Sequence, residues 1–111
     1  MILARWLDAR RPIPPAALRG RIDSALGSDL HADVEEVSDT LLSAGERLVR
    51  SLLEADATSR DAALDLLAAD ALVTYAFEAA SEHPAELTSR AAAAMARIAA
   101  LSAAPERRGF A

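Results

Sequence analysis

Alanine makes up almost half of the apolar residues of this chain, and that ratio limits what the chain can fold into. Of 58 apolar residues among 111, 28 are alanine and 30 are larger. Alanine, leucine and arginine favour helix, whereas the chain has only four Val, four Ile and four Thr, so strands are not expected. Thirty large side chains fill one modest core, which predicts a single domain, residues 1–111, without a spacious active-site cavity.

The spacing of apolar residues, broken by prolines and glycines, predicts five helices. They span about residues 2–10, 15–26, 33–56, 60–82 and 84–103. Asp33 is the expected N-cap of the third helix, and Thr58 or Ser59 that of the fourth. This pattern predicts an all-α fold: an antiparallel bundle of the three long helices, with the two short N-terminal helices packed across it. Residues 104–111 are expected to form a frayed tail.

The third expected helix carries two apolar stripes about 100° apart. The first contains Val34, Val37, Leu41, Leu48, Leu52 and Ala55. The second contains Leu42, Val49 and Leu53, and it should widen the buried arc. Gly45 lies on the apolar side, where glycine weakens a helix, so we expect either close approach of another helix or a weak point there.

The sequence argues against several classes of protein. Without cysteine there is no disulfide framework and no thiolate metal site, and Arg5 and Asp8 interrupt any signal-peptide core, so a cytoplasmic protein is expected. No uncharged stretch reaches the roughly 18 residues of a membrane span. The two histidines, His31 and His83, lack metal-ligand spacing, and no phosphate loop or nucleophile elbow is present. We therefore expect no metal, no cofactor and no self-contained enzyme.

Charge is distributed unevenly along the chain. The net charge is −5, which argues against a nucleic-acid partner for the chain as a whole. Residues 1–21 hold five arginines and one aspartate, whereas residues 22–111 hold seven arginines and 16 acidic residues. The basic N-terminal arm, about residues 1–14, should fold onto the acidic body, and contact with an anionic partner is the alternative.

Asp70 is the most unusual polar residue of the fourth expected helix. A helical projection places it between Leu66, Val73 and Phe77 on one side and Thr74 on the other. Asp70 should therefore point into the core or an interface, where a carboxylate must be paired, hydrogen-bonded or protonated. Its role is either structural, as a carboxylate hydrogen-bonded to Thr74, Arg97 or Arg47, or functional, as a ligand-binding or acid–base group.

The fifth expected helix is apolar almost all round. Leu87, Ile98 and Leu101 mark one face, and Arg97 is the only charge between Ala91 and Ala103. The opposite face is a candidate interface, because small residues let a second helix approach closely; its residues are Ala92, Ala93, Ala96, Ala99, Ala100 and Ala103. An alanine surface left exposed is the alternative.

Residues 69–78, Ala-Asp-Ala-Leu-Val-Thr-Tyr-Ala-Phe-Glu, resemble one helix of the trans-isoprenyl diphosphate synthases. That family usually has Gly where this chain has Ala69, and its two Asp-Asp-x-x-Asp motifs for magnesium and diphosphate are missing here. The resemblance therefore implies a helix-bundle relative or an accessory protein that pairs with something larger, and no carried-over catalysis. Convergence of alanine- and leucine-rich helices is the alternative.

These patterns lead to two functional hypotheses. The first is a small cytoplasmic, non-enzymatic interaction module that self-associates as a dimer or docks on a protein partner, through the alanine-rich C-terminal helix. The second is a binder of a small apolar ligand of the isoprenoid or lipid type. Its enclosed pocket would lie beside Tyr75 and Phe77, with Asp70 and Thr74 at the polar end.

Overall fold

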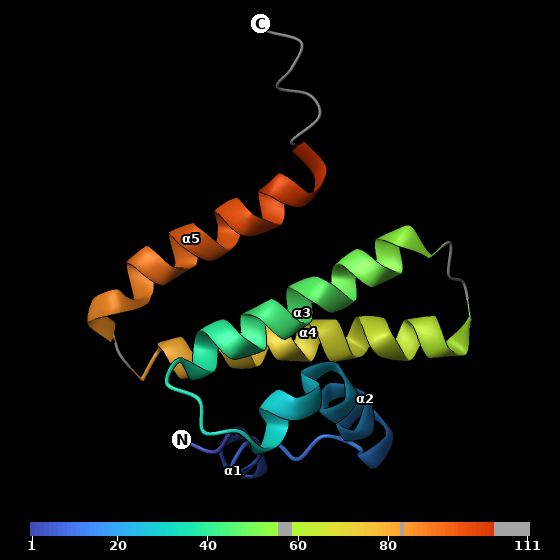
Figure 1. Ribbon diagram of the computed structural model, residues 1–111, viewed down its shortest axis with the longest axis horizontal. Helices are drawn as coiled ribbons and strands as arrows, with labels where there is room; N and C mark the ends of the chain where they lie inside the picture. Colours follow the sequence, from blue (N-terminus) through green and yellow to red (C-terminus); the bar gives the residue numbers. More distant parts are fainter. Residues whose placement is uncertain (56–58, 83, 104–111) are drawn as a thin grey trace, which may run out of the picture.

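The computed structural model describes residues 1–55, 59–82 and 84–103, and all regular elements in these ranges are helices. They are α1 (Leu3–Asp8), α2 (Ala16–Leu26), the 3₁₀ helix η1 (Gly27–His31), α3 (Val37–Glu54), α4 (Arg60–Ala80) and α5 (Pro84–Ala103). The α3 and α4 helices lie side by side as a hairpin, α1 and α2 cover one side of it, and α5 leads away from one end (Figure 1). The all-α prediction is confirmed.

The boundaries of α2, α4 and α5 agree with the prediction to within two residues. The Oγ of Ser59 accepts a hydrogen bond from the N–H of Ala62 at 3.1 Å, which confirms Ser59 as the cap of α4. Thr58, His83 and the predicted tail, residues 104–111, lie outside the described residues.

The start of α3 was predicted four residues too early. The helix begins at Val37, and Asp33 is not its cap. Instead, the Asp33 carboxylate pairs with the amino group of Met1, and the N–H of Val34 donates to the carbonyl oxygen of Met1 at 2.9 Å. These tertiary contacts hold the segment before α3 in an extended conformation, which overrides the local capping signal.

The core lies where the N-terminal helices meet the hairpin. Its four most deeply buried large side chains come from α1, α2, α3 and α4 in turn: Leu3, Ile22, Leu41 and Leu72. Trp6 and Leu7 complete the N-terminal contribution. The two short helices are therefore a structural part of the core and supply large side chains that the alanine-rich hairpin lacks.

Small residues bring α3 and α4 close together. A Cβ placed on Gly45 would lie 3.2 Å from Cγ2 of Val73, 3.4 Å from Cβ of Leu72 and 3.5 Å from the backbone oxygen of Ala69. The predicted close approach at Gly45 is therefore confirmed. Apart from Leu72, the buried residues of α4 are all alanines: Ala68, Ala69, Ala76, Ala79 and Ala80.

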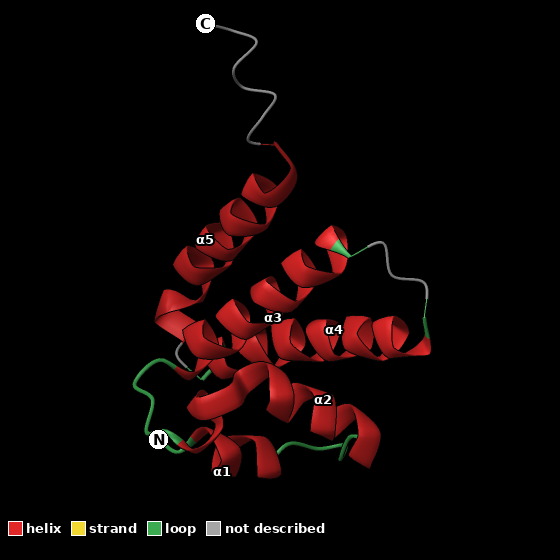
Figure 2. Cartoon of the chain, turned by 45° about the vertical axis from the view of Figure 1, so that its right-hand side comes forward, coloured by secondary structure: helices red, strands yellow, loops and turns green. Residues whose placement is uncertain are grey.

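The predicted bundle of three long helices is not confirmed. The antiparallel α3–α4 pair is present, but α5 meets it only over the first half of α3 and the end of α4 in the described chain, and then leads away from it (Figures 1 and 2). Among the described side chains of α5, Ala94 is the only buried one. The compact unit is α1–α4, and α5 is attached to its edge.

Candidate interaction surface

The one charged side chain described in α5 points toward its own hairpin. The Nε and Nη2 atoms of Arg97 each donate a hydrogen bond at 3.3 Å to the Glu46 carboxylate on α3, and Nη2 also donates to the Oγ of Ser43 at 3.2 Å. Nearer the start of α5, buried Ala94 lies over a small depression that Leu42 and Phe77 also line. The side of α5 that faces the hairpin therefore carries both a charged residue, Arg97, and the buried apolar residue Ala94.

The outward side of α5 is apolar. Its exposed residues between 91 and 101 are Ala92, Ala93, Met95, Ala96, Ala99 and Ala100. Met95 is 68% exposed, and Ile98 is 47% exposed although it lies one helical turn after buried Ala94, on the side of α5 that faces the hairpin. Five of the six predicted interface alanines lie on this outward side, and the side chain of Ala103 lies outside the described part.

In the described stretch, the outward side of α5 lacks the charged residues that a surface helix normally presents to solvent. A helix on a globular domain normally turns its apolar stripe inward and its charges outward. Here the Arg97–Glu46 pair holds the polar edge inward, because it provides the charged hydrogen bonds that α5 makes to α3 in the described chain. Exposed apolar surface of this kind is typical of interaction sites.

A second apolar surface runs along the hairpin. Because Gly45 faces Leu72 and Val73, and Leu42 lines a depression with Ala76 and Phe77, antiparallel counting sets Leu53 opposite Leu66. The side chains on this side form what we call the hairpin strip: Leu42, Val49 and Leu53 from α3 with Leu66, Val73 and Phe77 from α4.

On the α3 half of the hairpin strip exposure increases with distance from α5, and on the α4 half Leu66 is more exposed than Phe77, at 37%, and Val73. Leu42 is buried beside Ala94, Val49 and Val73 are half-buried, and Leu53 and Leu66 are 70% and 60% exposed. The sequence-based interpretation assigned the Leu42, Val49 and Leu53 stripe to the buried arc, and this is wrong for Leu53. The spacing was readable from the sequence, but the absence of a helix over this end was not.

The prediction that Asp70 points into the core of this chain is wrong, and the alternative that it faces an interface stays a prediction. Asp70 and Thr74 are both exposed, because α4 buries the alanine side that fits closely against α3 and leaves its bulkier side outward. The predicted partners of Asp70 are occupied elsewhere: Arg97 binds Glu46, and Arg47 donates to the carbonyl oxygen of Ala25. Among the described residues none pairs with Asp70.

Asp70, Thr74 and Tyr75 nevertheless lie together in an open groove of about 320 Å³. The segment before α2 forms its other wall. The full lining is Arg11, Pro12, Ile13, Pro14, Pro15, Asp70, Ala71, Thr74, Tyr75 and Glu78. Phe77 is not part of it, since that side chain lies on the α5 side of α4. The structure thus brings three of the four predicted ligand residues together, in a groove that is open to solvent.

The basic arm folds onto α4, as the charge distribution predicted. The guanidinium of Arg10 stacks on the Trp6 ring at 4.0 Å and lies 4.0 Å from the Glu78 carboxylate. The indole Nε1 of Trp6 donates to Glu82 at 3.0 Å, and the Trp6 ring meets Tyr75 edge to face.

Two further arginines, Arg21 and Arg19, also pair with acidic residues of the same chain. Arg21 on α2 binds Asp61 at 2.9 Å and Asp65 at 3.2 Å, which ties α2 to the start of α4. Burial acts to lower the pKa of Arg19, but its hydrogen bonds and charge attraction to Asp23 and Asp8 outweigh burial, so the pKa is raised. These contacts use the positive charge of residues 1–21 within the protein and leave less of it for an external anion.

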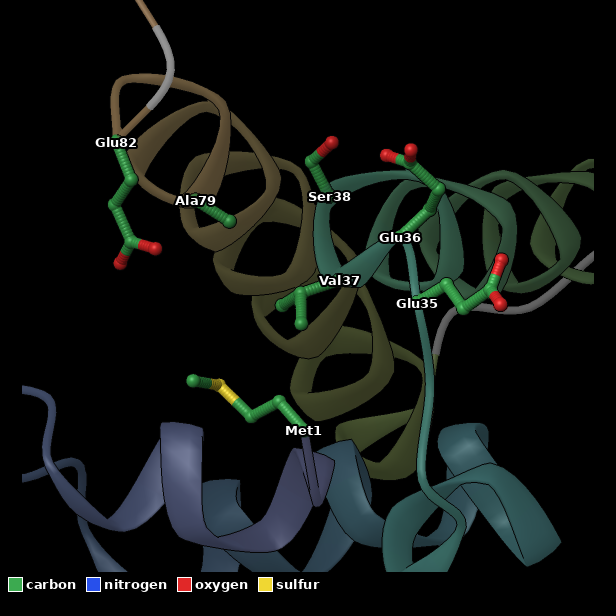
Figure 3. A pocket seen from close by; sticks show the side chains of 7 residues that line it. All are labelled: Met1, Glu35, Glu36, Val37, Ser38, Ala79 and Glu82. Atoms are coloured by element: carbon green, nitrogen blue, oxygen red, sulfur yellow. The ribbon is translucent and has the colours of Figure 1, made fainter.

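A smaller pocket of about 120 Å³ lies beside the start of α3. Figure 3 shows the Met1 side chain extending beneath Val37 on the side of Glu82, whereas Glu35 and Glu36 direct their carboxylates away from it. In the described ranges no three His, Asp or Glu side chains are grouped closely enough to hold a metal ion. This pocket therefore presents carboxylates without a convergent binding geometry.

Comparison with protein-family models, with curated proteins and with solved structures returned no match. None of the helices, as far as the chain is described, combines the length and apolar character needed to cross a membrane.

Proposed function

We propose that this protein is a non-enzymatic self-association module whose contact surface is the outward side of α5. One observation carries the proposal: α5 turns its described charge, Arg97, toward Glu46 and Ser43, and presents an uncharged side of alanines and Met95 to solvent. Covering Met95 and the exposed alanines beside it would remove apolar surface from water, which is the main driving force for association.

The alanines favour a helix as the contacting element. Ala92, Ala96 and Ala99 follow one another at spacings of four and three residues, which aligns them on one side of α5. Short side chains let two backbones approach closely. The commonest closed assembly of identical chains is a two-fold dimer, and we propose this state. The proposal places the protein in the cytoplasm, in keeping with its cysteine-free sequence.

Sedimentation equilibrium tests the proposal. The wild-type mass should rise from monomer to dimer with concentration, and Ala96→Glu should weaken dimerisation by about tenfold or more, because it buries an unpaired charge. Ala17→Glu is the matched control, since Ala17 is exposed on α2. A wild type that stays monomeric at millimolar concentration, or a dimer that Ala96→Glu leaves unchanged, would contradict the proposal.

A second candidate function rests on the groove at Asp70, Thr74 and Tyr75. It is the binding of a small apolar ligand, as the resemblance of residues 69–78 to prenyl synthases also suggests. The carboxylates of Asp70 and Glu78 line this groove and would repel a diphosphate, so a neutral prenyl alcohol is the better candidate. Trp6, the single tryptophan, contacts Tyr75 and reports on the groove by fluorescence.

Titration with farnesol and with farnesyl diphosphate tests this second candidate. Saturable change in Trp6 fluorescence with farnesol, lost in Thr74→Phe and kept in Ala63→Phe, would support it. Both positions are exposed on α4, but only Thr74 lines the groove. No saturable change with either compound would remove the candidate.

A further inference from the structure

The hairpin strip is the largest feature of the fold that the contact surface on α5 leaves unexplained. It presents leucine, valine and phenylalanine side chains, and Leu53 and Leu66 are mostly in solvent. Leu67, the neighbour of Leu66, is similarly exposed at 57% but lies about 100° further round α4, off the strip. The strip is therefore a defined apolar surface, made by one side of α3 and one side of α4.

The covered end of the strip indicates what the uncovered end accepts. At the covered end a helix of this same chain, α5, seats Ala94 over Leu42 and Phe77. The uncovered part, from Val73 to Leu66, is about 11 Å long, and the exposed stretch of α5 from Ala92 to Ala100 is about 12 Å long at 1.5 Å per residue. The two surfaces match in length and in apolar character.

We propose that the uncovered hairpin strip receives α5 of a second copy of this chain, and that the exchange is reciprocal. The inference rests on the proposed function and adds the receiving surface to it. Each copy has one outward apolar side of α5 and one uncovered hairpin strip. In a two-fold dimer each α5 packs on the strip of the other copy, so both surfaces of both copies are used and no further chain can add. Packing of α5 against α5 alone would leave Leu53 and Leu66 in water.

Matched leucine variants test the receiving surface. Leu66→Glu should raise the dimer dissociation constant at least tenfold, whereas Leu67→Glu should leave it unchanged. The two variants have the same chemistry, adjacent positions and similar exposure, and differ only in the side of α4 they occupy. Equal effects of the two variants on dimerisation would overturn the inference. Circular dichroism of each variant checks that the helices remain folded.

Cross-linking gives a second readout that does not depend on loss of stability. The chain has no cysteine, so Leu66→Cys and Ala96→Cys each introduce a single thiol. When the two variants are mixed and treated with a short bismaleimide, the inference predicts a covalent 66–96 dimer that a mixture of Ala96→Cys with Ser24→Cys does not form. Linkage of 96 to 96 alone would overturn it.

These outcomes separate the two proposals. A monomeric wild type removes both. A dimer that Ala96→Glu disrupts, but that Leu66→Glu leaves intact and that yields no 66–96 link, removes only the receiving surface and leaves the α5 contact in place.

Discussion

Arg97 and Glu46 join α5 to α3 through two hydrogen bonds of 3.3 Å each, with one nitrogen of the guanidinium bound to each carboxylate oxygen. Two parallel hydrogen bonds between charged groups have a defined geometry, so this contact, together with buried Ala94, favours one rotation of α5 about its own axis. Its consequence is that the apolar side of α5 faces solvent. The proposed function depends on this rotation.

Replacing Arg97 with alanine should loosen α5 without unfolding the protein. Arg97 is partly exposed and Ala94 keeps its contact, so the free energy of unfolding should fall by less than about 1 kcal/mol. Hydrogen exchange should accelerate across residues 84–103 and stay unchanged in α3 and α4. Arg50→Ala is the control, because its contact with Glu46 is longer, at 3.9 Å, and more exposed. Faster exchange throughout the chain would contradict this prediction.

Removing α5 altogether should leave a folded protein. The fully buried side chains of α1, α2, α3 and α4 do not depend on α5, so a chain ending at residue 82 should unfold cooperatively. Leu3→Ala, in contrast, should cost about 2–5 kcal/mol, as for other buried leucines. Thermal denaturation followed by circular dichroism compares the two. Loss of the cooperative transition in the shortened chain would show that α5 belongs to the core.

Gly45→Val should destabilise the protein by about 2 kcal/mol or more, because the hairpin has no space for a branched side chain beside Leu72 and Val73. Gly20 offers the comparison within the same chain. No atom of the described structure lies within 4 Å of a Cβ at Gly20, so Gly20→Ala should stabilise α2 by about 0.5–1 kcal/mol. Urea denaturation of both variants measures the difference. A neutral Gly45→Val would refute the close approach of α3 and α4.

Asp70→Leu should change the free energy of unfolding by no more than about 0.5 kcal/mol, because the side chain is exposed and has no partner among the described residues. If Asp70 were a buried carboxylate hydrogen-bonded within the core, its replacement would lower the free energy of unfolding several times more. Chemical denaturation of Asp70→Leu beside Arg21→Ala, which breaks the links to Asp61 and Asp65, checks the expectation. A large loss of stability in Asp70→Leu would contradict it.

Much of the local structure follows from the sequence. The helix α4 begins at the Ser59 cap and α5 begins at Pro84, because capping and proline geometry act within a few residues. The candidate interface alanines could be located for the same reason, since helical spacing groups them on one side. The position of Gly45 indicated a close helix contact, and its partner atoms on α4 required the fold.

The choice between the two sides of α4 was made by the tertiary structure. Helical spacing groups Leu66, Val73 and Phe77 on one side and the alanines with Leu72 on another, and hydrophobicity alone favours burying the larger set. The alanine side is buried because Gly45 lets α3 approach it closely and because α1 and α2 bring Leu3, Trp6 and Ile22 to fill the remaining space. Asp70 is exposed as a result.

The sequence by itself determined that this chain is helical, where most of its helices begin and end, and that its fifth helix is poor in charge. Only the tertiary structure decided which helix sides meet, because that depends on contacts between residues far apart in the chain. Glu46 and Arg97 are 51 residues apart, and their pairing turns the apolar side of α5 outward.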